Sequence, residues 1–239
     1  MQLTPNRTTP DVATTVERDA LLSALLLAAT GGLLDAAVYT LHEHVFANAM
    51  TGNAILLSIN LFNQNWMQAL RHFVPICAFL VGVASSRLLR TLPQFYASTI
   101  VLTLEMIVLG IAGFLPLSFP EMAFTAIIAF VSAFQVSTFR MVGRFTYNST
   151  FITGNLRDFA ESHIGCFIES DPAERRRNAA KAIKLFFICS SFLAGALLGA
   201  WAAPHFSNRA LWLAEPMLLI TLLRVLYFRE DSAIPHAHS

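Results

Sequence analysis

Residues 20–41 have the sequence ALLSALLLAATGGLLDAAVYTL, and this stretch decides the class of fold. It contains 22 residues, of which only Asp35 carries a charge. An α-helix needs about 20 consecutive apolar residues to cross a bilayer, so the stretch predicts a transmembrane helix. It lacks the small-residue cleavage pattern of a signal peptide. We therefore expect it to be retained, with residues 1–19 as a disordered N-terminal arm.

Five further apolar runs of similar length follow along the chain. Hydrophobic residues make up 55% of the sequence, charged residues make up 13%, and the mean hydropathy is +0.57. A soluble domain does not carry such an excess of apolar residues. The sequence therefore predicts an all-α integral membrane protein with six transmembrane helices and a tail at 229–239. The five further runs cover residues 70–89, 96–116, 121–139, 182–203 and 210–228.

Two shorter or more polar segments, 46–63 and 146–168, contain the same tripeptide, Thr-Gly-Asn. They are predicted to be short re-entrant or broken helices. Thr is a good helix N-cap, Gly permits close approach of two backbones, and Asn adds an amide, so each tripeptide could open a half-helix that holds an anion or a polar solute. The same residues could instead serve close packing of the two segments. They are Thr51, Gly52, Asn53, Thr153, Gly154 and Asn155.

The second half of the chain repeats other landmarks of the first half. Phe79-Leu-Val-Gly82 recurs as Phe192-Leu-Ala-Gly195, and Glu105 is matched by Glu215. A polar insert at 171–177, expected in a loop, accounts for the change of spacing between the landmarks.

We therefore divide the membrane part into two repeats, residues 20–116 and 120–228. Each repeat has three spans. An odd number of spans makes the second repeat enter the membrane in the opposite sense, which is the inverted-repeat architecture of many secondary transporters.

The distribution of cations predicts the orientation, because Lys and Arg accumulate in short cytoplasmic loops. With six spans and a cytoplasmic N-terminus, only Arg71 and Arg209 remain outside. Eight spans would move Arg87 and Arg90 outside as well, so we prefer six spans with both termini in the cytoplasm. The inside cations are Arg7, Arg18, Arg87, Arg90, Arg140, Arg144, Arg157, Arg175, Arg176, Arg177, Lys181, Lys184, Arg224 and Arg229.

One set of residues resembles a known family. Gly32-Leu-Leu-Asp35-Ala-Ala-Val-Tyr39 is followed by Phe46 and by Met50-Thr-Gly-Asn53, and Ala133-Phe-Gln135 precedes the second Thr-Gly-Asn. The chain is similar in these residues to the YoaK-like family of uncharacterised bacterial membrane proteins. The resemblance implies a fold and a location in the bacterial inner membrane, and it implies no activity.

Three carboxyl groups and one amide lie within predicted spans. Asp35, Glu105 and Glu215 cost free energy in a bilayer unless they face protein, water or a partner, so they are candidates for ion or proton coupling. Gln135 is expected to face the same cavity as Asp35. The alternative role for all four side chains is hydrogen bonding between helices.

Several function classes are excluded or disfavoured. The net charge of +1 gives no field for nucleic acid. Cys77, Cys166 and Cys189 lack metal or redox spacing, and His42-Glu43-His44 lacks the remaining ligands of a metal site. No phosphate-binding loop or nucleophile elbow is present, so we expect no catalytic residue, no metal and no cofactor.

The residues favour a secondary transporter or permease for a small solute or ion, with a site near the midplane formed by the two tripeptides, Asp35 and Gln135. The alternative is a non-transporting membrane protein with a structural, lipid-interacting or assembly role. Arg140, Arg144, Arg157 and the cluster 175–177 would then anchor anionic lipids, although a gate for anions is a second reading. Gly82, Gly195 and Gly199 could support helix contacts within one chain or in a homo-oligomer.

Overall fold

The fold is described from a computed structural model, which covers residues 10–89, 91–142, 145–150 and 152–233. Residues 1–9 of the expected arm and 234–239 of the expected tail lie outside the described residues, as do Arg90 and Arg144. Side chains are described within residues 20–227, apart from 90, 142–145 and 151.

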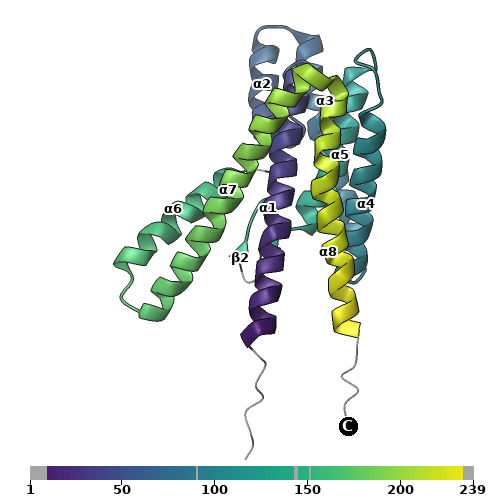
Figure 1. Ribbon diagram of the computed structural model, residues 1–239. Coiled ribbons are helices and arrows are strands. Elements are labelled where there is room, and N and C mark those ends of the chain that lie inside the picture. Colours follow the sequence, from purple (N-terminus) through teal and green to yellow (C-terminus); the bar gives the residue numbers. More distant parts are fainter. Residues whose placement is uncertain (1–9, 90, 143–144, 151, 234–239) are drawn as a thin grey trace, which may run out of the picture.

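The described chain is almost entirely helical, so the expected all-α class is confirmed (Figure 1). Two strands of two residues each form a small antiparallel hairpin between α5 and α6. The helices are α1 Pro10–Leu41, α2 Met50–Phe62, α3 Trp66–Leu89, α4 Gln94–Ala112, α5 Glu121–Thr138, α6 Ile152–Ile168, α7 Pro172–Phe206 and α8 Glu215–Ala233, with the 3-10 helix η1 at Ser207–Ala214 and the strands β1 Met141–Val142 and β2 Phe145–Thr146.

Five segments of the described chain are long and apolar enough to cross a membrane. Four correspond to α1, α3, α4 and α5. The fifth runs from Pro172 to Tyr227 and includes α7, η1 and α8. Within it the chain turns back at η1, so α7 and α8 run in opposite directions (Figure 1).

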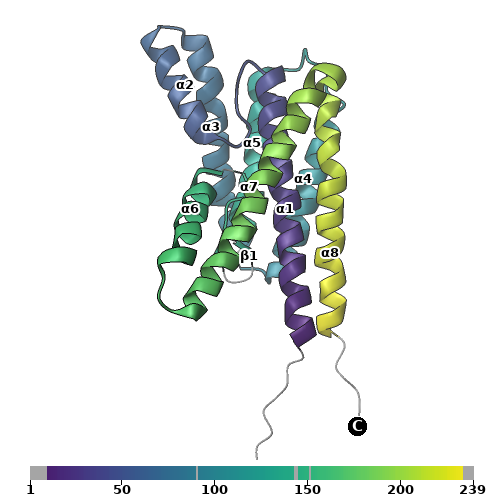
Figure 2. The same cartoon turned by 60° about the vertical axis from the view of Figure 1, so that its left-hand side comes forward.

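The helices form a bundle with two diverging arms. The most extensive contacts join α1 to α7 and α3 to α5, while α2 packs on α3 and α6 packs on α7 (Figures 1 and 2). The start of α1 and the end of α8 lie at the same end of the molecule, below α6 in both views. The largest buried apolar cluster joins α1, α4, α5, α7, η1 and α8, and it includes Leu34, Leu109, Phe124, Leu211 and Leu218.

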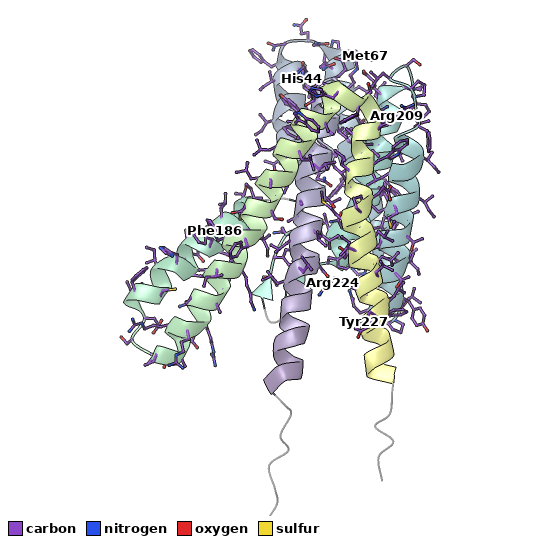
Figure 3. The ribbon with its side chains drawn as sticks, in the orientation of Figure 1. His44, Met67, Phe186, Arg209, Arg224 and Tyr227 are labelled. Atoms are coloured by element: carbon purple, nitrogen blue, oxygen red, sulfur yellow. The ribbon has the colours of Figure 1, made fainter. Side chains whose placement is uncertain are left out.

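Large apolar side chains also cover the outer surface, as the sticks of Figure 3 show. Leu80 on α3, Leu193 on α7 and Leu223 on α8 are more than half exposed, and Phe186, labelled in Figure 3, belongs to the same set. A continuous apolar exterior on long helices is the surface that lipid tails cover.

Several boundaries differ from the expectation. Helix α1 begins at Pro10, so residues 10–19 are helical where a disordered arm was expected. Residues 172–177 were expected in a loop, but they form the first turns of α7. Asp171 explains the early start, since its side chain accepts a hydrogen bond from the N–H of Ala173 (3.0 Å) and Pro172 occupies the first helical position. Residues 210–214 belong to η1 rather than to the sixth helix.

The chain reverses after α1 through Glu43 and His44, which both have positive φ angles (50° and 61°). His42 Nε2 lies 2.9 Å from Oδ1 of Asn208, and its ring stacks on Phe124. Glu43 forms an ion pair with Arg71 (2.9 Å). The His-Glu-His sequence therefore ties the end of α1 to its neighbours, and residues 45–49 return along α1 toward the start of α2.

Candidate binding site at the centre of the bundle

The loops that precede α2 and α6 both meet α1 at Gly31, in the middle of the apolar stretch 20–41. The carbonyl oxygen of Gly31 accepts a hydrogen bond from Nδ2 of Asn48 (3.3 Å). A Cβ built on Gly31 would lie 2.7 Å from the carbonyl oxygen of Ser149 and 3.1 Å from Cα of Thr150. Only glycine allows the second loop to approach α1 this closely.

Asp35 lies one turn of α1 beyond Gly31, and its carboxylate is bound to the loop before α2. Oδ1 accepts hydrogen bonds from the backbone N–H groups of Asn48 (2.6 Å) and Ala49 (3.3 Å). The first N–H groups of a helix have no partner within it, and a negative charge there is favourable. Asp35 therefore holds the two residues that precede α2, and it places a carboxyl group near the start of that helix.

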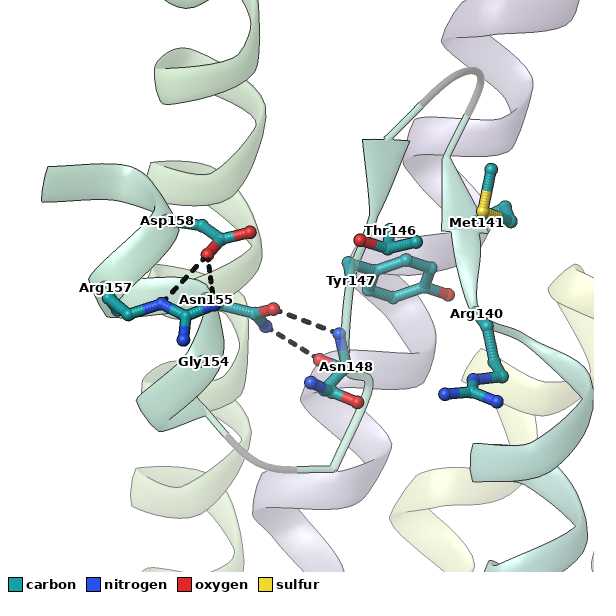
Figure 4. Close-up of a pocket in the computed structure, with 9 residues that line it drawn as sticks. All are labelled: Arg140, Met141, Thr146, Tyr147, Asn148, Gly154, Asn155, Arg157 and Asp158. Atoms are coloured by element: carbon teal, nitrogen blue, oxygen red, sulfur yellow. Dashed lines mark hydrogen bonds and ion pairs between the residues drawn. The ribbon is translucent and has the colours of Figure 1, made fainter. Parts of the chain in front are cut away.

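Asn53 and Asn155 form the same bidentate contact in the two segments. Nδ2 of Asn53 donates to the carbonyl oxygen of Phe46 (2.8 Å), and its Oδ1 accepts from the N–H of Phe46 (2.9 Å). Nδ2 of Asn155 donates to the carbonyl oxygen of Asn148 (2.7 Å), and its Oδ1 accepts from the N–H of Asn148 (3.0 Å; Figure 4). We call this contact the amide clasp. Each clasp holds the residue seven positions earlier, so both amides position loops.

The glycines of the tripeptides make room for the clasped residues. A Cβ on Gly52 would lie 2.7 Å from the ring of Phe46, and a Cβ on Gly154 would lie 3.3 Å from Nδ2 of Asn148. Thr51 and Thr153 are not N-caps as expected, because α2 and α6 begin one residue before each of them, and both side chains are exposed. The tripeptide therefore holds the preceding loop folded back onto the helix.

Gln135 reaches α1 one turn before Gly31. Its Nε2 donates to the carbonyl oxygen of Leu27 (3.3 Å) from α5. Leu27, Gly31 and Asp35 are spaced by four residues and share one face of α1. Polar groups from α5 and from both loops thus converge on that face.

Five buried side-chain oxygens around this face have no hydrogen-bond partner among the described residues. Each unpaired buried polar group costs about 1–3 kcal/mol, and native proteins satisfy nearly all of them with protein, water or ligand. The five atoms are Oδ1 of Asn48, Oγ of Ser132, Oε1 of Gln135, Oγ of Ser149 and Oγ1 of Thr150. We call this set the central polar cluster. Of these residues, only Gln135 was expected in the site. A sequence signal for two others is their spacing, since Asn48 and Thr150 each precede an Asn of the tripeptides by five residues.

The profile of a family described as "Protein of unknown function (DUF1275)" matches residues 23–224. The chain belongs to this family. It is also 28% identical over 216 residues to the UPF0700 transmembrane protein YoaK of Bacillus subtilis (strain 168). This alignment covers 85% of this chain and 91% of that protein. No solved structure matches the chain. The transmembrane relative and the apolar helices together identify this DUF1275 chain as a multi-pass membrane protein, as the YoaK-like residues indicated.

A second polar site of the DUF1275 chain lies between α4 and α8. Glu105 is fully buried in α4, and Glu215 is the first residue of α8. The two carboxyl groups are close enough to interact electrostatically. Both oxygens of Glu105 and Oε1 of Glu215 have no hydrogen-bond partner within the described chain. The structure therefore brings the two matched glutamates together and keeps them on helices other than those of Asp35 and Gln135.

A pocket of about 480 Å³ opens beside the start of α6 (Figure 4). Gly154 and the buried Asn155 of the DUF1275 chain contribute to its wall. The pocket is lined by Arg140, Met141, Thr146, Tyr147, Asn148, Gly154, Asn155, Arg157 and Asp158.

Proposed function

We propose that this protein is a secondary transporter or permease for a small polar solute or ion, with its binding site at the central polar cluster. In this proposal the chain has six spans in two inverted repeats, lies in the bacterial inner membrane with cytoplasmic termini, and has no catalytic role. The observation that carries it is the meeting of two half-helix loops, with five unpartnered oxygens, at the middle of α1.

The packing of the helices supports the inverted repeats. If α1 to α4 correspond to α5 to α8, the contact of α3 with α5 corresponds to that of α7 with α1, and the contact of α2 with α3 corresponds to that of α6 with α7. The matched glycines agree with this correspondence between helices. Gly82 closes the contact of α3 with α5, and Gly195 closes the contact of α7 with α1.

The direction of the chain supports a site near the midplane. Helices α1 and α5 run in opposite directions, and α2 and α6 extend from the centre toward opposite ends (Figures 1 and 2). Residues 20–41 span about 33 Å at 1.5 Å per residue, close to the roughly 30 Å of the hydrocarbon core. A span of this length would place Gly31 near the middle of the bilayer.

The positions of the cations support cytoplasmic termini. Arg71 of α3 pairs with Glu43 and Glu121, and Arg209 lies in η1, at the end opposite Arg224 and Tyr227 (Figure 3). The other described cations lie toward the end that holds the termini, which fits a cytoplasmic face.

The carboxyl pair supports coupling to protons. Two neighbouring carboxyl groups in a low-dielectric bundle are most stable when one of them carries a proton. A permease that alternates between two packings of its repeats could load that proton on one side and release it on the other. Asp35 is less suited to this role than the pair, because its Oδ1 is bound to the loop before α2.

One observation favours the alternative, a non-transporting structural, lipid-interacting or assembly protein. Asp35, Asn53 and Asn155 are all engaged in contacts that hold loops, so the two half-helices could form a dry joint. The cations at the end of the molecule that holds the two termini would then bind lipid or a partner.

Water access to the central polar cluster separates the two functions. Cys77, Cys166 and Cys189 are first replaced, and single cysteines are introduced at Asn48, Gln135 and Thr150. Leu109 in the apolar cluster is the control. Labelling of the three polar positions by a membrane-impermeant thiol reagent, with Leu109→Cys protected, is expected for a transporter. Protection of all four positions in folded protein would reject the transport site.

A further inference from the structure

We propose that the pocket between the β1–β2 hairpin and the start of α6 binds a small oxyanion, such as a carboxylate or a phosphate. The pocket is distinct from the central polar cluster, since it contains none of its five atoms. Its volume of about 480 Å³ falls within the range of small-ligand sites, about 300–1,000 Å³. Its lining residues carry the argument through their charge, their free donors and their position at a helix end.

Arg140 supplies a positive charge to the pocket. Among the described residues it forms no ion pair or side-chain hydrogen bond, although it lies at the end of α5 and lines the pocket. Its guanidinium extends toward Asn148 in Figure 4. A free guanidinium offers up to five N–H donors in the planar arrangement that carboxylate and phosphate oxygens match.

The other charges of the pocket compensate one another. Arg157 lies 2.9 Å from Oδ1 of Asp158 and 3.8 Å from Glu161, and Lys181 of α7 lies 3.4 Å from Oδ2 of Asp158. The hydrogen bond from Arg157 holds the pKa of Asp158 below its usual range, so this carboxyl group remains an acceptor committed to two cations. Arg140 therefore makes the pocket attractive to anions.

Tyr147 supplies a buried donor. Only 6% of the residue is exposed, yet its hydroxyl has no hydrogen-bond partner within the described chain. Its backbone N–H donates to the carbonyl oxygen of Arg140 (3.0 Å), which fixes the two residues side by side. Burial raises the pKa of the phenol, so the hydroxyl stays protonated and can donate. In Figure 4 it points toward the side of Arg140.

The start of α6 adds a third feature that favours an anion. The helix has 17 residues, and its first N–H groups and its dipole are positive toward the pocket. Gly154 leaves this turn open, and the side-chain amide of Asn148, which has no partner among the described residues, lies beside it. A guanidinium, a phenol and an amide thus surround one space at a helix N-terminus.

An oxyanion in this pocket has two sources, a free solute or the phosphate of a lipid headgroup. Binding of an oxyanion in this pocket does not depend on the function proposed above. The further step, that the anion is the transported solute, rests on that proposed function. The protein in nanodiscs of zwitterionic lipid is titrated with inorganic phosphate and with trifluoroacetate, and binding is followed by broadening of their ³¹P and ¹⁹F resonances. Anionic phosphatidylglycerol is then added to the discs in a second series.

We expect broadening of at least one probe by the wild-type protein and at least tenfold weaker binding by Arg140→Gln. Tyr147→Phe should weaken binding several-fold. The matched control is Arg177→Gln, which removes an arginine that pairs with Glu174 (2.6 Å) and does not line the pocket, and it should leave binding near wild type. Loss of probe binding on addition of phosphatidylglycerol would assign the site to a lipid phosphate, and retention would assign it to a solute.

Two results would overturn the site: no broadening of either probe in zwitterionic discs, or an equal loss in Arg177→Gln and Arg140→Gln. Failure of the transport function has a different signature. Anion binding with a dry centre would reject transport and keep the pocket, while a water-accessible centre without anion binding would reject the pocket alone.

Discussion

The starts of α2 and α6 share the amide clasp and differ in the residues around it. At α2 the amide clasp of Asn53 holds Phe46, whose ring covers Gly52, and the carboxylate of Asp35 caps the loop. At α6 the clasp of Asn155 holds Asn148, and the joint opens onto a pocket that contains Arg140.

The difference lies in charge and in space. A carboxylate neutralises the positive end of α2, and an aromatic ring fills the room beside it. A guanidinium faces the corresponding end of α6, and a cavity takes the place of the ring. The repeated tripeptide therefore maintains the contact between loop and helix, while the neighbouring residues decide whether the start of the helix is covered or accessible to a ligand. Under the proposed function, this arrangement is closed toward the outside and open toward the cytoplasm.

Removal of the two amide clasps is expected to have the largest effect on stability. The loss should differ between the start of α2 and the start of α6. Asn53→Ala leaves the N–H and C=O of Phe46 unpaired in an enclosed site, so unfolding should become easier by roughly 2–4 kcal/mol. Asn155→Ala should cost about half as much, because water in the adjacent pocket can hydrate Asn148. Denaturant unfolding in mixed micelles measures both differences.

Asn60→Ala is the control for this pair, since the side chain of Asn60 bonds only within α2, to the carbonyl oxygen of Leu56 (2.8 Å). Its effect should stay within about 0.5 kcal/mol. Equal losses for Asn53→Ala and Asn155→Ala would show that the second joint is as dry as the first.

The matched glycines give the next largest effect. A Cβ on Gly195 would lie 1.9 Å from the carbonyl oxygen of Ala29, and one on Gly82 would lie 2.5 Å from that of Phe130. Gly195→Ala and Gly82→Ala should each destabilise the protein by about 1–3 kcal/mol, the first more than the second, because backbone must move. Thermal unfolding in detergent measures the order.

Gly110→Ala supplies the control, because its nearest neighbour, Oε1 of Glu215, would be at an ordinary 3.7 Å. A Gly82→Ala protein as stable as the control would contradict the equivalence of the two helix contacts.

Much of this fold follows from apolar length alone. The run 20–41 predicts the span of α1, and the cations predict which ends share a side. The boundaries that failed had local signals. Asp171 and Pro172 followed by Glu174 form an N-terminal capping pattern, but the adjacent arginines suggested a loop, so ten helical residues of α7 were missed.

The site was harder to predict, because its partners are far apart in the chain. Asp35 and Gln135 were expected at the centre, and both reach it, but the atoms they contact belong to Asn48, Ala49 and Leu27. A polar residue in a span predicts that some partner exists and does not identify it. The role of Asn53 as a clasp required the turn of the loop, which depends on Gly52 and on the contact with α1.

Neutralising Asp35 should have a smaller effect on stability. Asp35→Asn keeps an oxygen that can accept from the N–H groups of Asn48 and Ala49 but removes the charge at the start of α2, at an expected cost of about 0.5–1 kcal/mol. Asp35→Ala should cost more, because both N–H groups lose their acceptor. Comparison of the two variants by unfolding in micelles separates charge from hydrogen bonding. Equal stabilities of the two variants would refute the role of these hydrogen bonds in holding the loop before α2.

The smallest expected effect is a pH dependence at the closed end of the molecule. Burial lowers the pKa of His42, which lies beyond the last residue of α1 and contacts Asn208. The unfolded chain then binds a proton near pH 6.5 while the folded chain still does not. The contribution of His42 to stability is therefore complete above about pH 6.5 and declines as the pH falls toward the lower folded pKa.

The melting temperature in detergent should accordingly fall between pH 7.5 and 5.5, and the fall should be smaller in His42→Gln. His163→Gln is the matched control, because His163 lies on α6, away from this contact, and should keep the wild-type dependence. A fall of the same size in His42→Gln would show that this end opens without charging His42, and that the closed joint depends on Asp35 and the clasp alone.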